Sequence, residues 1–116
     1  MKKIITISAL LIASLGIAQT PVSIEQNEIR YIKELEEGKQ VYLGSIEGYQ
    51  ENAKGYEVSI ENIQTGAGVK IKGNRPLSKL VFWSAFRTVC PEPYINIRVD
   101  PGETFTWEIV YSFYSL

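Results

Sequence analysis

The chain has 116 residues, of which 45% are hydrophobic and 11% are aromatic. Twelve Lys and Arg residues against thirteen Asp and Glu residues give a formal net charge of −1, so no electrostatic feature favours nucleic-acid binding. With one cysteine and no histidine, the sequence excludes an internal disulfide, a histidine-dependent catalytic triad and the commonest zinc ligand.

Residues 1–18 have the pattern of a secretory signal peptide. Lys2 and Lys3 precede an apolar run that ends at Ile17, and the small residues Gly16 and Ala18 predict cleavage after Ala18. The apolar run is shorter than the roughly 20 residues that span a membrane, so an uncleaved anchor is only the alternative. We therefore expect a secreted or periplasmic protein with a formal charge of −3 after cleavage and no membrane association.

Residues 19–38 carry conflicting signals and are predicted as an N-terminal arm or a short helix. Ser23 and Gln26 have the spacing of a capping box, and apolar residues recur at helical spacing from Ile29 to Leu35. Acidic residues crowd 34–37, where the helix dipole favours cations instead. Helix and coil both remain open for residues 23–37.

From residue 39 the hydrophobic period changes to two, which predicts strands. Residues 41–46 form the first predicted strand. Apolar and polar residues then alternate over 56–61 and 69–72, and the Gly-rich segment 65–68 between them predicts a hairpin. Residues 80–83 are apolar at every position, which predicts a central strand covered on both faces.

The C-terminal third predicts two further strands around a turn. Residues 94–99 alternate, and Asp100-Pro101-Gly102 has the composition of a tight turn. Every second residue from Phe105 to Phe113 is apolar, which predicts a long strand whose Phe105, Trp107, Ile109, Tyr111 and Phe113 face the core. Short strands with turn residues between them predict an antiparallel β-sandwich over residues 39–116.

The segment 82–94 contains the candidate site residues. Glu92 lies between Pro91 and Pro93, which restrict its backbone, and a fixed carboxylate beside apolar residues can serve as a general base or accept hydrogen bonds from sugar hydroxyls. Tyr94 and Trp83 could stack on sugar rings, although aromatic residues more often fill the core.

Plainer structural roles remain open for the same segment. Glu92 can be an exposed turn residue. Arg87 is near enough in sequence to pair with Glu92, either as a surface salt bridge or as a donor to a ligand. Cys90 is interpreted as a small buried hydrophobe, with intermolecular pairing or a reactive thiol as alternatives. The sequence has no phosphate loop, metal-ligand spacing or nucleophile elbow, so we expect no cofactor and no metal.

The segments LVFWS (80–84), TVCPEPY (88–94) and PGETFTW (101–107) resemble the C-terminal end of the aldose 1-epimerase, or galactose mutarotase-like, superfamily. There a short strand leads to a Glu-Pro segment, and a Pro-Gly-Glu turn opens the last sandwich strand. The resemblance covers residues 76–114, about a third of the chain. It implies part of an antiparallel supersandwich that binds carbohydrate in a cleft on one sheet.

The function that this family resemblance implies for the chain depends on Glu92. Glu92 matches the family glutamate that abstracts the proton of the anomeric hydroxyl, whereas the histidine that protonates the ring oxygen has no counterpart here. The resemblance therefore implies a sugar-binding module without efficient turnover, and whether it is an enzyme stays open.

The family domains are about twice as long or longer, so the chain resembles a short or truncated version. A half-sandwich would expose apolar sheet and unpaired strand edges, which favours a homodimer or a partner chain. The alternative function is an exported, non-catalytic protein-interaction or structural module.

Overall fold

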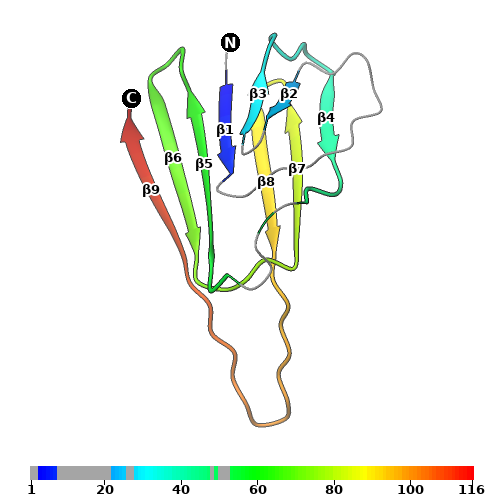
Figure 1. Ribbon diagram of the computed structural model, residues 1–116, viewed down its shortest axis with the longest axis vertical. Helices are drawn as coiled ribbons and strands as arrows, with labels where there is room; N and C mark the ends of the chain where they lie inside the picture. The colour runs from blue at the N-terminus through cyan, green and yellow to red at the C-terminus, as the bar shows by residue number, and fades with distance from the viewer. Residues whose placement is uncertain (1–2, 8–21, 26–27, 48, 50–52) are drawn as a thin grey trace.

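The computed structural model describes residues 3–7, 22–25, 28–47, 49 and 53–116, and this part of the chain contains strands and no helix. Two antiparallel sheets pack together, one of six strands in the order β2-β3-β1-β5-β6-β9 and one of three in the order β4-β7-β8 (Figure 1). The strands are β1 (Lys3–Ile7), β2 (Val22–Glu25), β3 (Glu28–Tyr31), β4 (Gln40–Leu43), β5 (Tyr56–Asn62), β6 (Ala67–Gly73), β7 (Lys79–Ala85), β8 (Thr88–Tyr94) and β9 (Ile109–Ser115). The predicted all-β antiparallel sandwich is therefore confirmed.

Turn chemistry fixes two of the connections. Asn62 ends β5 and accepts the backbone N–H of Gln64 on its side-chain oxygen at 3.1 Å, and Gly66 follows with φ of 69°. At the far end of the molecule, Glu103 N–H donates to Asp100 C=O at 3.0 Å while Gly102 has φ of 82°. Both positive angles favour glycine, as the sequence predicted for the hairpin and the Pro-Gly turn.

The core lies between the inner faces of the two sheets. Phe82, Leu80, Ile29 and Val58 are almost completely buried there, and each contributes about 1.5 to 3 kcal/mol through removal of apolar surface from water. β7 is the middle strand of its sheet, and Val81 on its other face is also only 3% exposed. β7 is therefore a central strand as predicted, buried along its inner face and at Val81 on its outer face, whereas Trp83 on the outer face is only half-buried.

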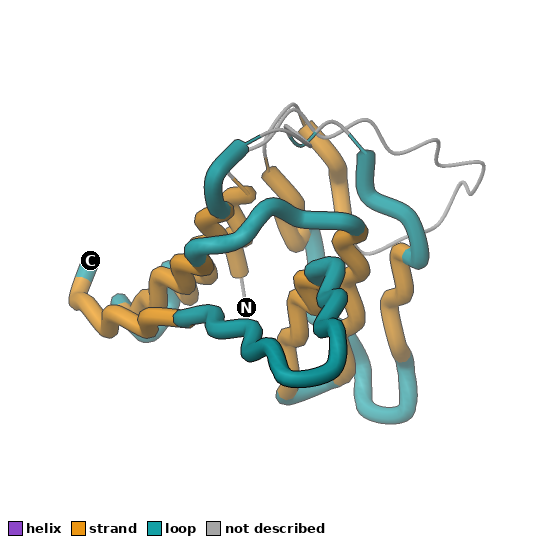
Figure 2. Tube along the Cα trace, turned by 90° about the horizontal axis from the view of Figure 1, so that it is seen from below, coloured by secondary structure: helices purple, strands orange, loops and turns teal. Residues whose placement is uncertain are grey.

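The three-stranded sheet covers only part of the six-stranded sheet. Along one row of paired residues on the inner face, exposure rises from 1% at Val58 to 9% at Ile71 and 57% at Tyr111. The smaller sheet lies over the β2–β3 side, whereas β9 forms the opposite edge (Figures 1 and 2). An apolar face that is core at β5 is therefore open to solvent at β9.

One predicted strand is absent, and another is shorter than its hydrophobic pattern. The strand expected over 94–99 is wrong, because β8 ends at Tyr94, where its partner β7 begins at Lys79. The strand expected from Phe105 begins only at Ile109, because its partner β6 ends at the paired Gly73. Residues 95–108 instead form a long loop that passes from one sheet to the other (Figure 1).

The core-facing role predicted for the last strand is also wrong. Trp107, Ile109, Tyr111 and Phe113 have exposed fractions of 50%, 39%, 57% and 82%. Ile109, Tyr111 and Phe113 lie on the same side of the sheet as the core residues, but no part of the smaller sheet among the described residues covers them. The alternation correctly indicated one apolar face and could not show that the face lacks a cover.

The N-terminal region differs from both alternatives left open for residues 23–37. β2 and β3 pair as an antiparallel hairpin in place of a helix or an irregular arm, and Ile29 and Tyr31 enter the core. β1 lies between β3 and β5, while residues 8–18 of the predicted signal peptide lie outside the described residues. Cleavage after Ala18 stays a prediction. No described segment is a helix that is long and apolar enough to cross a membrane.

Candidate functional site

Three of the four predicted site residues share the outer face of the three-stranded sheet. Glu92 and Tyr94 alternate along β8 with Pro91 and Pro93, whose side chains are on the inner side because successive strand residues point to opposite faces. On the neighbouring strand, Trp83 pairs with Cys90 and so lies on the same outer face. Glu92 is a half-buried strand residue and not an exposed turn residue.

The Glu92 carboxylate has two partners on its own strand. The Tyr94 hydroxyl donates to Oε2 at 3.2 Å, and the Cys90 thiol lies 3.9 Å from Oε1. The hydrogen bond to the carboxylate, followed by its negative charge, raises the pKa of Tyr94 above its ordinary value. Glu92 is thus an acceptor held in a fixed direction. It suits binding of a hydroxyl group.

The aromatic part of this outer face is exposed. The Trp83 indole N–H donates to the Gln40 side-chain oxygen of β4 at 3.1 Å, which fixes the ring against that strand. Tyr42 pairs with Trp83 and is 65% exposed, and Tyr94 is 47% exposed. Together with Glu92, these side chains form an open aromatic and acidic surface, which we call the outer patch (Tyr42, Trp83, Glu92 and Tyr94).

The structure does not bring Arg87 to this patch. Arg87 is in the turn between β7 and β8, where its guanidinium lies over the Phe86 ring at 5.3 Å. Glu92 is four residues from the start of β8, about 14 Å along the strand. The expected pairing of Arg87 with Glu92 is therefore wrong. Lys79 is the cation beside the patch, with its Nζ over the Tyr94 ring at 5.7 Å.

These contacts limit the chemistry of the outer patch. The sequence has no histidine to act with Glu92 as a proton donor. Within the residues that the structure describes, no group of three or more Cys, Asp and Glu side chains could hold a metal ion. The aromatic rings and the fixed carboxylate of the patch suit binding of polar rings.

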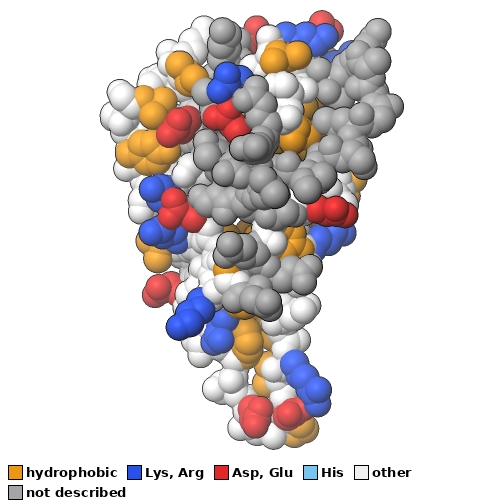
Figure 3. All heavy atoms as spheres, viewed as in Figure 1, with side chains coloured by type: hydrophobic (Ala, Val, Ile, Leu, Met, Phe, Trp, Pro, Cys, Tyr) orange, Lys and Arg blue, Asp and Glu red, His pale blue; other side chains and the backbone are white. Residues whose placement is uncertain are grey.

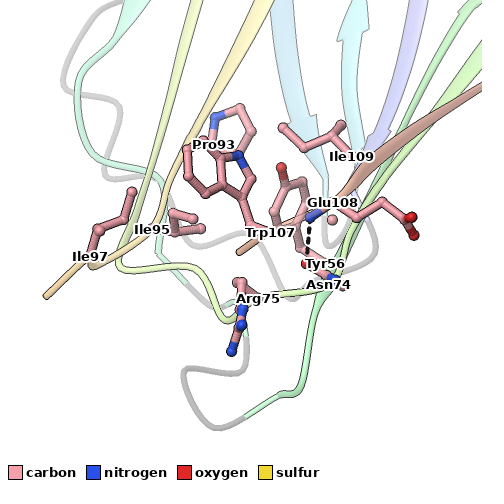
Figure 4. Close-up of a pocket in the computed structure, with 10 residues that line it drawn as sticks. Tyr56, Asn74, Arg75, Pro93, Ile95, Ile97, Trp107, Glu108 and Ile109 are labelled. Atoms are coloured by element: carbon pink, nitrogen blue, oxygen red, sulfur yellow. Dashed lines mark hydrogen bonds between the residues drawn. The ribbon is translucent and has the colours of Figure 1, made fainter. Parts of the chain in front are cut away.

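A small pocket lies where the 95–108 loop meets the ends of β5 and β6. Its walls are mostly apolar, with Trp107 in the middle, Ile95 and Ile97 on one side and Ile109 on the other (Figure 4). The side chain of Glu108 points away from the pocket. The Trp107 side of the pocket comes from the loop that the sequence analysis assigned to a strand.

The polar groups of this pocket fasten the loop. Asn74 accepts the Glu108 backbone N–H at 2.8 Å, and Arg75 donates to Thr106 C=O at 2.6 Å while its guanidinium lies 4.6 Å from the Phe105 ring centre. The pocket volume of about 110 Å³ is well below the 300 Å³ or more of ordinary small-molecule sites. We therefore assign the pocket to packing of the loop.

A wider hollow, lined by residues with polar side chains, lies on the outer face of the six-stranded sheet. It is lined by Ser59, Glu61, Lys70, Ser112 and Tyr114. The Tyr114 hydroxyl donates to Glu61 at 2.7 Å, and Lys70 pairs with Glu57 at 3.3 Å. Partial burial and the neighbouring Glu61 raise the pKa of Tyr114. Its charged groups already pair within the protein, so the hollow offers a ligand little unpaired charge.

The surface that the sequence analysis missed is β9 itself, the edge strand of the six-stranded sheet. Leu116 N–H donates to Gly66 C=O at 2.9 Å, and Asn74 N–H donates to Glu108 C=O at 3.2 Å. Both pairs continue the β6–β9 register, so the even-numbered residues of β9 direct their N–H and C=O groups to β6. The same groups of Ile109, Tyr111, Phe113 and Ser115 point away from the sheet.

Side chains make this edge apolar as well. Hydrophobic side chains reach the surface along the side of the molecule where β9 lies (Figure 3). Residues 109–116 contain no charged residue and no proline. That composition is the signal in the sequence that could have identified an unprotected edge, because natural edge strands usually carry charge or proline.

Comparisons with protein-family models, with curated proteins and with solved structures find no match to this chain. The resemblance to the aldose 1-epimerase superfamily therefore has no support from these comparisons.

Proposed function

We propose that this protein is a non-catalytic interaction module that binds another protein chain by strand addition at β9. The observation that carries the proposal is the outer edge of β9, where backbone groups without a partner strand among the described residues and exposed apolar side chains occur on the same seven residues. A strand that docks there would gain ladder hydrogen bonds and place its own side chains beside the exposed apolar side chains of β9. Export follows from the predicted signal peptide and belongs to the same proposal.

The other sheet edges are poorer templates. β8 carries Pro91 and Pro93, which lack an N–H and which sheets accept where that group would face solvent. β2 and β4 have only four residues each. β9 has seven residues and no protective residue. Proteins usually protect a long apolar edge, so an unprotected edge is best explained by a binding role.

Site-specific photo-cross-linking in the cells that produce the protein tests this function. A benzoylphenylalanine at position 113, which is 82% exposed, should cross-link to a protein that contacts β9. The matched control carries the same group at Ile32, which is 59% exposed and lies outside the paired strands. Cross-linked products specific to position 113 support strand addition. Identical patterns at both positions, or no product at 113, contradict it.

Carbohydrate binding at the outer patch is the second candidate function. It is favoured by Tyr42, Trp83 and Tyr94 beside the fixed carboxylate of Glu92, and by the family resemblance. Aromatic rings can stack on sugar rings while the carboxylate accepts their hydroxyls. Calorimetric titration with galactose and glucose tests it: binding should weaken about tenfold or more in Tyr94→Ala and remain in Ile32→Ala. Absence of any heat of binding counts against it.

A further inference from the structure

We infer that the strand that docks on β9 is β9 of a second copy of this chain, antiparallel and centred on Ser112. This inference rests on the proposed function and adds the identity and the register of the partner. It would join the two six-stranded sheets through a two-fold axis that passes beside Ser112. In such an isologous interface the same patch serves both copies.

The alternating direction of the backbone N–H and C=O groups along β9 restricts the register of the pairing. The outward-facing groups belong to odd-numbered residues, so an antiparallel pairing of β9 with itself must place odd residues opposite odd residues. Centring on Ser112 places Tyr111 opposite Phe113 of the second copy and Ile109 opposite Ser115. This register also aligns the whole strand Ile109–Ser115 with its copy. A pairing centred on Tyr111 or Phe113 would leave residues at the strand ends unpaired.

Side chains are self-complementary in this register. On the inner face, Tyr111 of each copy would lie beside Phe113 of the other, an aromatic cross-strand pair of the kind that stabilises sheets. Tyr111 and Phe113 lie at the exposed end of rows of paired residues that run across the sheet from the core. In these rows Phe113 pairs with Val69, and Tyr111 pairs with Ile71. The second copy would therefore extend the inner face of the first and contact its exposed aromatic side chains from the side.

Charge supports a second copy over a charged partner. Residues 109–116 carry no charged side chain, so two copies meet without repulsion along the strand. The nearest lysines, Lys70 and Lys72 of β6, already pair with Glu57 of β5 at 3.3 and 3.2 Å on the outer face. A neutral and self-complementary edge fits its own copy, while an acidic or basic strand would meet no opposite charge on β9.

A disulfide between the two copies tests the register. In the Cys90→Ser background, Ser112→Cys should give a covalent dimer under mild oxidation, because Cα atoms in a directly opposed, non-hydrogen-bonded pair are about 4.5 Å apart, within disulfide range. Val110→Cys in the same background is the matched control. Its copies would be displaced by four residues, about 14 Å, and should not cross-link.

Sedimentation of the purified protein gives the independent measurement. We expect a concentration-dependent dimer whose dissociation constant rises about tenfold or more in Phe113→Lys and is unchanged in Ile32→Lys. A chain that stays monomeric at all concentrations, or a dimer insensitive to Phe113→Lys, overturns the inference. So does a dimer that cross-links through position 110 and not through 112. Cross-linking in cells from position 113 to a different protein would overturn self-pairing and leave strand addition intact.

Discussion

At the scale of single residues, Glu57 shows how the outer face of the six-stranded sheet is stabilised. Its carboxylate contacts Lys70 Nζ at 3.3 Å and Lys72 Nζ at 3.2 Å. Partial burial acts to raise the pKa of Glu57, but the hydrogen bonds and charges of the two lysines outweigh it and lower the pKa. A lowered folded-state pKa means that Glu57 stabilises the fold above its unfolded value of 4.5 and loses this contribution as the pH falls through the folded value.

We therefore predict that Glu57→Gln lowers the free energy of unfolding by about 0.5 to 1 kcal/mol at pH 7, as expected for two solvent-screened pairs. Urea unfolding at pH 7 and at pH 3 measures it, and the difference from wild type should be smaller at pH 3. Glu103→Gln in the exposed Asp100–Glu103 turn is the control and should change neither value. A difference of equal size at both pH values would show that packing, and not charge, is involved.

The outer patch was partly predictable from the sequence at the scale of single residues. Trp83, Glu92 and Tyr94 were expected near one another, and the period of two along a strand places Glu92 and Tyr94 on one face. Arg87 was placed wrongly because residues that are close in sequence can be far apart along an extended strand. The two-residue connection between β7 and β8 leaves Arg87 at one end of β8, whereas Glu92 lies four residues along that strand. Only the register could show that Lys79 is the neighbouring cation.

At the scale of the elements, alternation predicted the strands β4, β5, β6 and β9, but it missed β2, β3 and most of β8 and wrongly indicated a strand over 94–99. The hairpin of β5 and β6 and the turn at Gly102 follow from local chemistry that the sequence contains. The ends of β8 and β9 depend on their partners, since β7 begins at Lys79 and β6 ends at Gly73. Coverage of β9 depends on the width of the other sheet, a property of the whole molecule that no local pattern records.

The alternating direction of the backbone groups along β9 leads to a prediction about proline substitutions. Ser112→Pro removes an N–H that faces β6, whereas Phe113→Pro removes one that faces solvent. The first substitution should cost about 1 to 3 kcal/mol more than the second, because only it leaves a ladder partner unsatisfied. Chemical unfolding of both variants in dilute solution measures this difference. Equal losses would show that the outward direction assigned to residue 113 is wrong.

At the scale of the whole molecule, β1 links two parts of the large sheet. It pairs antiparallel with both β3 and β5, so those two strands run parallel to each other. If the signal peptide is cleaved after Ala18, β1 leaves the sheet, and β3 and β5 must pair in parallel or remain apart. The predicted processing therefore has a structural consequence for the six-stranded sheet.

We predict that a chain without residues 1–18 is less stable than the full chain by about 2 kcal/mol or more, because hydrogen bonds on both sides of β1 are lost. Urea unfolding of the two chains, produced without export, measures the difference. Ile5→Pro in the full chain is the matched variant and should give a loss of the same sign, since it interrupts the ladder in the middle of β1. Equal stability of the short and full chains would show that β1 contributes nothing.

The most direct test of strand addition at β9 is amide hydrogen exchange, followed by NMR in dilute and in concentrated protein. In dilute protein, the amides of Val110, Ser112 and Tyr114 should be protected by β6, while those of Tyr111 and Phe113 exchange rapidly. At high concentration, Tyr111 and Phe113 should become protected as the second strand docks. If these two amides are already protected in the dilute monomer, or exchange rapidly at every concentration, the outer edge of β9 does not accept a strand from a second copy.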